Sequence, residues 1–451
     1  MNIKDISENK FCIGCGNCAV ANPDVHNLVE NELGLIDIES VESDTDEYLN
    51  VCPFTQEKLN EDYFNARYEA NDSKFEPGVG HYQNIYAGYD VSQGSRVLSS
   101  SGGLSTYLLA ELFRRGKISK AVVVVSSGEG DARQKYKIIS NITDLNTSRK
   151  SKYHLVSHHE CVKDLLSLDE QEDVAYVGVP CGIKAMKILC ENSPKLKKII
   201  KYNISIFCGH QKSHAFSEFV GWQLGVQPEH LQHLDYRVKS PSPDASKYYY
   251  EATDKKKAAV KKRVDRLKWM GWDLGLFKPK ACDFCDDVAG ECADIIFGDA
   301  WDKKYAKDYR GTNIVLTRNK ELESILLEGR EKNSIKLYEE GVEFLFSTQG
   351  GNFRNRHEGL ISRMRYYDSK DYKYPKKSET RTRRYSHNLE RDHIYIARHK
   401  ISMMSHEAFL EAKKRGNLNV FFELMKPFVH SYNKSNYRFI HRIKSLIKKL
   451  Y

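Results

Sequence analysis

The chain has 451 residues, a formal net charge of +9 and 40% hydrophobic residues, a length that predicts two to three domains with ample material for a core. No apolar run reaches the roughly 18 residues of a spanning helix, so the sequence predicts no transmembrane segment. The first residues show no apolar signal region, and eleven cysteines in such a chain indicate metal ligands rather than disulfides. We therefore expect a cytoplasmic protein.

Residues 1–70 are predicted to form a ferredoxin-like segment that binds a 4Fe-4S cluster. Their first cysteines follow the C-x2-C-x2-C spacing of bacterial ferredoxins, at Cys12, Cys15 and Cys18. Asn22 stands where that pattern has its fourth cysteine, and the missing thiolate returns later as Cys52, followed by proline. This arrangement is expected if one of two ancestral clusters has been lost. Zinc is the alternative, although its sites usually pair cysteines as two separated C-x2-C arms.

The middle of the chain has the pattern of an α/β domain. A polar stretch with proline and glycines at 69–80 predicts a linker, and the domain is expected at 81–350. Strands are predicted at 85–89, 121–125, 174–179 and 202–207. They alternate with helical patterns, which favours a mostly parallel sheet. Residues 239–265 are polar and lysine-rich, and we expect them to be an exposed excursion.

A second set of cysteines falls at the ends of predicted strands. Cys181 and Cys208 each follow a strand, at the carboxyl edge where ligands collect in parallel α/β sheets. A C-x2-C pair follows at Cys282 and Cys285. These four predict a second four-thiolate 4Fe-4S site, with zinc again as the alternative. The other cysteines here are expected to be buried spectators: Cys161, Cys190 and Cys292, the last of which is also an alternative ligand.

Residues 361–451 form a basic C-terminal extension, with 22 Lys and Arg against 8 Asp and Glu, which leaves residues 1–360 at a net charge of −5. We predict that the extension is largely helical. Its last residues, 434–451, place apolar side chains on one helical stripe surrounded by basic ones. Three interpretations stay open: packing of the stripe on the body, contact with the inner membrane face, and nucleic-acid binding. The third is the least favoured, because no recognised nucleic-acid-binding module accompanies the basic residues.

The order of these motifs resembles the coenzyme F420 hydrogenase/dehydrogenase beta-subunit family, iron–sulfur flavoproteins that also include a plant chlorophyll-metabolite reductase. Within this family, the chain resembles the bacterial branch that is associated with polysaccharide genes. Besides both cysteine sets, the matching pieces are residues 100–103, 150–153, 176–181, 207–209 and 293–301. The resemblance covers residues 10 to about 305 and implies an FAD-containing α/β core with a 4Fe-4S cluster beside the flavin.

The resemblance also implies roles for residues outside the cysteine sets. A small-residue turn before a helix suits the FAD pyrophosphate, because it exposes backbone N–H groups at the helix N-terminus; here it is Ser100, Ser101, Gly102 and Gly103. Lys152 is a candidate contact to phosphate or flavin. Asp299 is a candidate hydrogen-bond partner of the cofactor and Trp301 a candidate stacking partner, with a turn cap and core packing as the alternatives. His210 is a weak catalytic candidate, and a structural histidine is the alternative.

We therefore predict an oxidoreductase that passes electrons between two 4Fe-4S clusters and FAD. A flavin exchanges electrons in pairs with organic molecules and singly with metal centres, so the combination connects the two kinds of transfer. The expected partners are an electron carrier such as ferredoxin and a small-molecule substrate, which the resemblance suggests is a sugar or sugar nucleotide in polysaccharide biosynthesis. The alternatives are a non-catalytic electron-transfer subunit of a larger complex and a zinc-stabilised binding protein.

Overall fold

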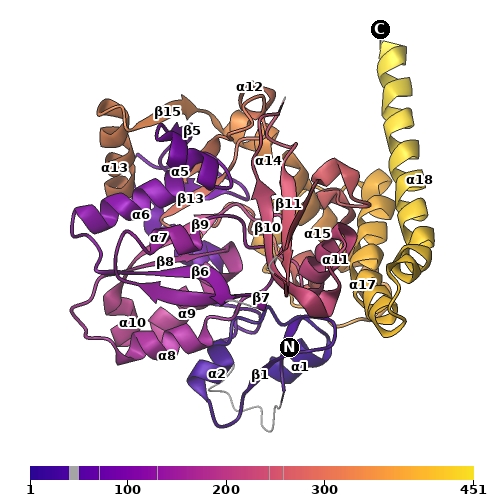
Figure 1. Cartoon of the computed structure of the whole chain (residues 1–451), viewed down its shortest axis with the longest axis horizontal. Helices are drawn as coiled ribbons and strands as arrows, with labels where there is room; N and C mark the ends of the chain where they lie inside the picture. The colour runs from indigo at the N-terminus through magenta and orange to yellow at the C-terminus, as the bar shows by residue number, and fades with distance from the viewer. Residues whose placement is uncertain (40–49, 71, 129–130, 243, 257, 451) are drawn as a thin grey trace.

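The computed structural model describes residues 1–39, 50–70, 72–128, 131–242, 244–256 and 258–450. At its centre lies an eight-stranded sheet with the strand order β15-β5-β14-β13-β9-β8-β6-β7 (Figure 1). The strands are β5 (Ile85–Asp90), β6 (Lys120–Gly128), β7 (Asp131–Ile139), β8 (Val174–Gly178), β9 (Ile200–Ile206), β13 (Ile295–Asp299), β14 (Asn313–Thr317) and β15 (Ile335–Glu340).

The sheet is mixed, and its parallel part is the middle. The pairs β6–β8, β8–β9 and β9–β13 are parallel, and the four remaining pairs are antiparallel. Five of the eight strands nevertheless run in the same direction. The prediction of a mostly parallel α/β sheet is thus confirmed, with antiparallel strands added at both edges. At the β6–β7 edge the reason is a short hairpin connection, which can join only antiparallel strands.

Helices cover both faces of the sheet, giving three layers. One face packs against α6 (Leu104–Arg114) and α13 (Lys320–Glu331). The opposite face packs against α8 (His159–Ser167), α9 (Pro180–Asn192), α10 (Pro194–Ile199) and α14 (Val342–Arg356). Neighbouring residues of β6 alternate between them, since Val123 joins the first core and Val122 the second. The shorter helices of this body are α5 (Gln93–Leu98), α7 (Leu145–Ser148) and α12 (Lys303–Ala306).

The N-terminal segment consists of short elements, and the first of them lie at the lower end of Figure 1. They are α1 (Ile3–Glu8), α2 (Asn17–Ala21), the hairpin β1 (Leu28–Glu30) and β2 (Ile36–Ile38), α4 (Glu61–Asn65) and η1 (Ala66–Tyr68). The predicted linker at 69–80 is wrong, because this stretch forms most of a second hairpin, β3 (Lys74–Glu76) and β4 (Gly80–Tyr82). Its turn needs Gly78, whose φ is +77° and whose missing Cβ would lie 2.3 Å from the ring of His357.

The predicted exposed excursion at 239–265 is also wrong. It belongs to a separate antiparallel sheet of β10 (Leu231–Val238), β11 (Tyr249–Asp254) and β12 (Ala259–Arg263). The lysine-rich β12 is exposed, but Tyr250 and Ala252 of β11 are buried in a core that includes α11 (Ala215–Leu224). The 3-10 turns of the chain's second half are η2 (Pro228–His230), η3 (Val264–Arg266), η4 (Trp272–Leu274), η5 (Lys280–Phe284) and η6 (Leu389–Arg391).

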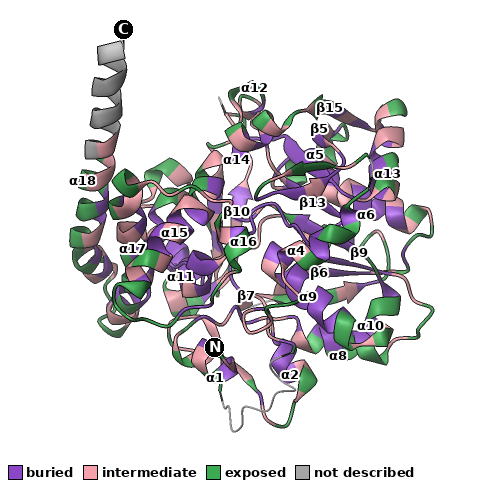
Figure 2. Ribbon diagram, turned by 180° about the vertical axis from the view of Figure 1, so that it is seen from behind, coloured by how far each residue is buried: buried purple, intermediate pink, exposed green. Residues whose placement is uncertain are grey.

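The C-terminal extension is helical, as predicted, with α15 (Glu358–Asp368), α16 (Glu379–Thr382), α17 (Asp392–Lys414) and α18 (Leu418–Leu450). The first part of α18 packs on the body, since Phe421, Met425 and Val429 are buried against the α11 core (Figure 2). The predicted amphipathic stripe begins at Tyr437, which is exposed, and its other members, Ile440, Ile443, Ile447 and Leu450, have side chains outside the described residues.

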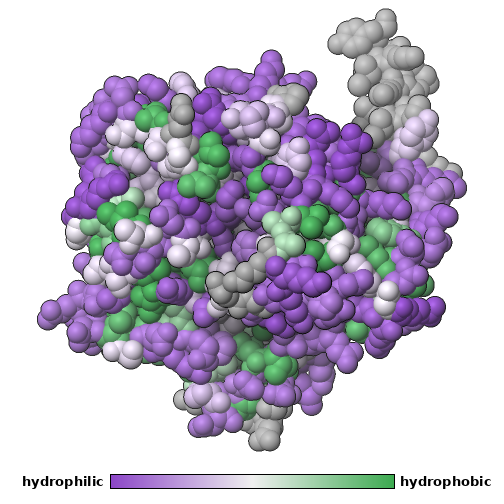
Figure 3. All heavy atoms as spheres, viewed as in Figure 1, coloured by the Kyte–Doolittle hydropathy of each residue, from purple (hydrophilic) through white to green (hydrophobic). Residues whose placement is uncertain are grey.

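The molecular surface in the view of Figure 3 is mostly hydrophilic, with apolar side chains in small groups. Among the described residues, no helix is both long enough and apolar enough to cross a membrane.

Candidate functional site

The four cysteines of the N-terminal segment lie around one cavity, although Cys52 is far from the others in sequence. We call them the first cysteine set: Cys12, Cys15, Cys18 and Cys52. Cys12 and Cys15 lie in the loop between α1 and α2, and the Gly14 amide donates a hydrogen bond of 3.3 Å to the Cys12 sulfur. The loop turns tightly at Gly16, whose φ is +87° and whose missing Cβ would lie 2.6 Å from the Cβ of His159.

Asn17, between two of these cysteines, holds the cavity together. Its side chain is completely buried and donates hydrogen bonds of 2.9 Å to the carbonyls of Val51 and Ala185. Its Oδ1 lies 2.8 Å from Nε2 of His158. Asn17 therefore fixes the residue before Cys52 next to the cysteine run, and it ties both to α9. This residue could not be predicted from the sequence, where its only signal was a polar side chain inside the cysteine motif.

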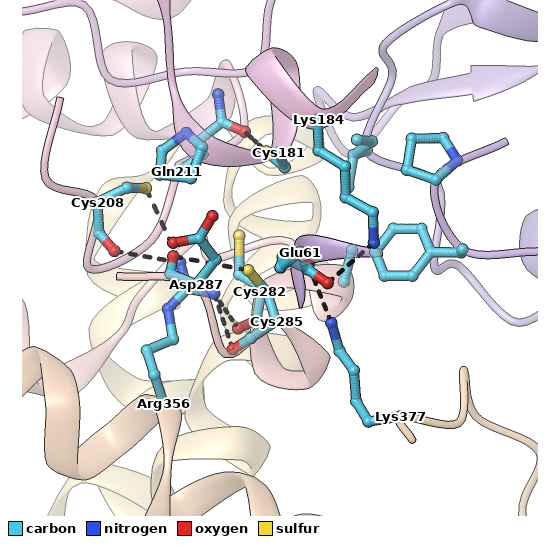
Figure 4. Close-up of a pocket in the computed structure, with 15 residues that line it drawn as sticks. Glu61, Cys181, Lys184, Cys208, Gln211, Cys282, Cys285, Asp287, Arg356 and Lys377 are labelled. Atoms are coloured by element: carbon cyan, nitrogen blue, oxygen red, sulfur yellow. Dashed lines mark hydrogen bonds and ion pairs between the residues drawn. The ribbon is translucent and has the colours of Figure 1, made fainter. Parts of the chain in front are cut away.

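The second cysteine set lines a second cavity (Figure 4): Cys181, Cys208, Cys282 and Cys285. Cys181 lies in the first turn of α9, directly after β8, and Cys208 follows β9. The parallel strands thus bring both to one edge of the sheet, as the strand-end rule predicts. Cys282 lies in η5 and Cys285 follows it, in the loop that precedes β13.

Arg356, the last residue of α14, anchors the backbone of the second cysteine set. Its Nη1 donates to the carbonyls of Cys282 and Cys285 at 3.0 and 3.1 Å. Its Nη2 donates to the Cys208 carbonyl at 3.3 Å and lies 3.8 Å from the Cys208 sulfur. Nε donates to the Gly209 carbonyl at 2.8 Å. The side chain is 2% exposed, and the sequence offered no signal for it.

Further charged residues line the second cavity and come from three parts of the chain. Glu61 of α4 lies 3.2 Å from Lys184 of α9 and 3.3 Å from Lys377 of the C-terminal extension. Lys377 also pairs with the buried Asp286 at 2.8 Å. Arg381, completely buried, pairs with Asp286 and with Glu291. The N-terminal segment and the extension are therefore clamped onto the central domain at this cavity.

Both cysteine sets have a chemistry that suits a bound metal group. Burial raises the pKa of the Cys18 and Cys208 thiols to about 12, and burial followed by the neighbouring cysteines raises that of Cys181 well above its usual range. Such thiols ionise only when a cation supplies compensating charge, as iron or zinc does. Four thiols around one space are the donor set of a 4Fe-4S cluster. Within the described residues, no three potential ligands meet at the spacing of a single ion.

The two cavities adjoin each other. Ile13, Pro53 and Phe54 line both of them. Two of these residues neighbour cysteines of the first set, because Ile13 follows Cys12 and Pro53 follows Cys52. Only a thin wall of apolar side chains therefore separates the two sets.

Residues 99–103, here called the Ser-Gly loop, end at the N-terminus of α6. Gly103, with φ of +87°, is the residue before the helix. A Cβ on Gly102 would lie 2.6 Å from the carbonyl of Gly88, so only glycine lets the loop lie this close to β5. Ser101 donates a hydrogen bond of 2.9 Å to the Thr312 carbonyl. Ser100 meets Ser151 at 2.9 Å, which joins the loop to the Lys150–Lys152 segment.

Arg237 connects the Ser-Gly loop to Asp299 and Trp301, the two candidate contacts of the cofactor. Its Nη1 lies 2.8 Å from both carboxylate oxygens of Asp299 and donates to the Ser100 carbonyl at 3.3 Å. Its guanidinium lies 5.2 Å from the centre of the Trp301 ring, which is 38% exposed. Asp299 and Trp301 thus lie beside Ser100. Arg237 was not predicted from the sequence, because the strand that holds it, β10, was not predicted either.

Two half-buried lysines flank the same loop. Lys152 donates to the carbonyls of Arg149 and Lys150, and burial lowers its pKa to about 8. Lys239, a second residue that the sequence analysis missed, donates to the Arg96 and Ser101 carbonyls at 2.8 Å. Burial lowers the pKa of Lys239 to about 7. With Arg237, these cations make the surroundings of the loop attractive to an anion.

In the part of the chain that the structure describes, His210 has no acidic partner. Its ring stacks on Trp272 with centroids 4.4 Å apart, and its buried Nε2 has no hydrogen-bond partner. Burial, followed by the charge of Lys212, lowers its pKa well below the usual range. The ring is therefore neutral at physiological pH, and the geometry offers no acid–base pair at this position.

The remaining cysteines are core residues. Cys161, Cys190 and Cys292 are buried and belong to the apolar cluster around α8 to α10. Cys292 does not line the second cavity. The expectation that Cys161 and Cys190 are buried is thus confirmed, and the geometry places Cys292 with them.

Fold and site together define a cysteine-rich α/β protein with two adjoining four-thiol cavities. The chain belongs to the coenzyme F420 hydrogenase/dehydrogenase beta-subunit family. The model of the family's N-terminal part matches residues 85–163, and that of its C-terminal part matches residues 171–341. The family resemblance read from the motifs is therefore confirmed.

Two individual proteins are similar to this chain. An uncharacterized protein of Methanocaldococcus jannaschii is 23% identical over 244 residues, which are 53% of this chain and 82% of that protein. A chain in the structure of a xenon derivative of the F420-reducing nickel–iron hydrogenase complex from Methanosarcina barkeri shares 14% identity, with a TM-score of 0.48. That match covers 65% of this chain and 96% of the other.

Proposed function

We propose that this protein is an iron–sulfur flavoprotein oxidoreductase that binds two 4Fe-4S clusters and one FAD. Membership in a family of hydrogenase and dehydrogenase subunits supports redox chemistry in general terms. The observation that carries the specific proposal is the adjacency of the two cavities, each lined by four cysteines and sharing Ile13, Pro53 and Phe54. Zinc sites with a purely structural role would have no need to adjoin.

The protein's own residues would hold each group in a defined way. Each cysteine set supplies four thiolates for one cluster, and Asn17 and Arg356 keep the separate ligand segments in place. Apolar side chains between the cavities exclude water from the path between the clusters. When bound, the clusters transfer single electrons and the flavin transfers electrons singly or in pairs.

We place the FAD at the Ser-Gly loop. The N-terminus of α6, with glycines that let a ligand approach the backbone, suits a pyrophosphate. Lys152, Lys239 and Arg237 supply positive charge around it. Trp301 offers an exposed ring for stacking, and Asp299, held by Arg237, offers a carboxylate for hydrogen bonding.

Helix α14 connects this location to the second cavity. Three of its polar side chains, spaced like one helical face, are Gln349, Asn352 and Arg356. Gln349 donates to the Asp299 carbonyl at 3.0 Å, and Asn352 donates to Gln349 at 2.9 Å. A Cβ on Gly209, next to Cys208, would lie 2.3 Å from Asn352 Oδ1. The order along the molecule is therefore first set, second set, flavin site, with an electron carrier such as ferredoxin docking near the first set.

The substrate we propose is a small organic molecule, with a sugar or sugar nucleotide as the first choice by analogy with the polysaccharide-associated branch. The second candidate function is that of a non-catalytic electron-transfer subunit, which the family description as a beta subunit favours. The two differ in whether the isolated chain turns over a substrate.

Variants of each cysteine set test the cluster assignment. Cys15→Ser and Cys282→Ser, purified without oxygen, are each expected to lose about half of the iron and sulfide, since each removes a ligand of one cluster only. Full retention in both variants, or zinc in place of iron, would contradict the proposal.

Turnover separates the two candidate functions. The reduced protein is mixed with sugar nucleotides, and the flavin absorbance is followed with time. Reoxidation by one of them, with formation of a reduced product, supports the enzyme. Reoxidation only by protein electron acceptors would identify an electron-transfer subunit.

A further inference from the structure

Arg356 differs from the other arginines that lie at the second cavity or in its charge network. Its five donor contacts go to four backbone carbonyls and to one cysteine sulfur. Among the described residues, no carboxylate forms an ion pair with it. By contrast, Arg381 is buried to the same degree but pairs with Asp286 and Glu291.

A buried guanidinium without an anion is costly, because it has lost its hydration. The four cysteines of the second set and Asp287 line the same cavity as Arg356, and the Cys208 sulfur lies 3.8 Å from its Nη2. A cluster held by four thiolates is itself an anion and gains further negative charge when it is reduced. The arginine therefore interacts more strongly with the reduced state than with the oxidised one.

The position of Arg356 in the chain adds a second point. It lies beyond residue 341, where the match to the family model ends. Lys377, another cation that lines the cavity, lies still further along the chain. The cavity is thus completed by residues outside the matched ranges.

We propose that Arg356 is a positioning residue of the second cluster, which holds the backbone at three of its four cysteine ligands and raises its reduction potential. This inference rests on the proposed function, because it requires a cluster at the second cysteine set. The charge and the hydrogen bonds of Arg356 have separable effects. Its charge sets the potential, and its fork of donors fixes the ligand backbone.

The test compares Arg356→Gln, which removes the charge, with Arg356→Lys, which keeps the charge but lacks the branched set of guanidinium donors. Redox titration of the full chain, followed by electron paramagnetic resonance, measures the midpoint potential of each cluster. In Arg356→Gln we expect reduction of the second cluster to be disfavoured about tenfold, which is about 59 mV for a one-electron couple. In Arg356→Lys the potential should stay near that of the unaltered protein, and the first cluster should not change in either variant.

Arg318 offers a matched control. It is also buried, and all its donors go to backbone carbonyls, those of Val79, His81, Ala289, Gly290 and Ala293. Arg318→Gln should therefore destabilise the fold in a similar way, because carbonyls are left unpartnered, without shifting the second cluster's potential. An equal shift in Arg318→Gln and Arg356→Gln would overturn the proposal.

The remaining outcomes are also decisive. If Arg356→Gln fails to assemble the second cluster while Arg356→Lys and Arg318→Gln retain it, the charge is required and the proposal is supported. If Arg356→Lys keeps the cluster but shifts its potential as much as Arg356→Gln, the role of the charge is refuted. An unaltered protein without iron would refute the proposed function instead, so the two failures are distinguishable.

Discussion

Asn17 shows how a single side chain makes a remote ligand part of a local motif. It binds the carbonyls of Val51 and Ala185 and the ring of His158, so three elements depend on it. Asn17→Ala leaves these buried groups unpartnered and is expected to lower the free energy of unfolding by about 1–3 kcal/mol. The iron content of the first set should fall as well. Denaturant unfolding and iron analysis check both effects.

The control for Asn17→Ala is Asn27→Ala, since Asn27 is exposed and, among the described residues, its side-chain nitrogen bonds only to the surface residue Glu39. That variant should keep its iron and its stability. Equal behaviour of the two variants would show that Asn17 has no special role at the first cavity.

The lysines at the Ser-Gly loop predict a pH-dependent affinity for FAD. Burial lowers the pKa of Lys239 to about 7 and that of Lys152 to about 8. Below these values both are cations that attract a pyrophosphate, and above them the charge is lost. FAD affinity should therefore be constant below pH 7. Above pH 7 it should fall by up to roughly tenfold per pH unit for each lysine that loses its charge.

Fluorescence titration of the flavin-free protein at pH 6.5 and 9 measures this effect. Riboflavin, which has no phosphate, is the control ligand and should bind equally at both values. Lys152→Met should weaken FAD binding at the lower pH and flatten part of the pH dependence. The same pH response for riboflavin and FAD would place the pyrophosphate elsewhere.

At the scale of elements, the C-terminal extension is a structural part of the site. Lys377 and Arg381 pair with acidic residues at the second cavity, and Phe421 and Met425 of α18 fill the core around α11. The ends of the chain are also oppositely charged. Residues 1–70 hold 4 Lys and Arg against 15 Asp and Glu, whereas residues 361–451 are strongly basic. Ion pairs such as Lys373–Asp5 and Arg384–Asp62 join them.

Two truncations test this integration. A chain that ends at residue 360 loses the buried pairs and the α18 contacts, and should be insoluble or free of the second cluster. A chain that ends at residue 436 keeps Tyr432 and the other α18 side chains that are buried in the described part of the helix, and should retain the content of iron and flavin. Cofactor analysis of both proteins decides. Full cofactor content in the shorter chain would show that the extension is a separable tail.

At the scale of the whole molecule, the order of sites predicts how electrons travel. In the proposed order, the second set and α14 connect the first set to the Ser-Gly loop. Cys15→Ser should therefore block reduction of the flavin by reduced ferredoxin, while small dithionite ions still reduce it. Stopped-flow absorbance measures both rates. Unchanged reduction by ferredoxin would show that electrons enter elsewhere.

The sequence predicted those features that depend on short-range patterns. Cysteine spacing and strand ends brought Cys181, Cys208, Cys282 and Cys285 to one cavity, and the Ser-Gly loop was placed correctly before a helix. Three-residue strands such as β3 and β4 were read as a linker, because their polar turn dominates so short a segment. Other residues of the sites act through tertiary contacts between distant segments, which no local pattern reveals. They are Asn17, Arg356, Arg237 and Lys377.

The most direct test of the account is the cofactor content of the intact chain purified without oxygen. Two four-iron clusters and one flavin predict about eight irons, about eight sulfides and one FAD per chain, without zinc. The visible spectrum should bleach in two phases when dithionite is added. About four irons with zinc, or a chain without flavin, would contradict the central claim and assign a structural role to one cysteine set.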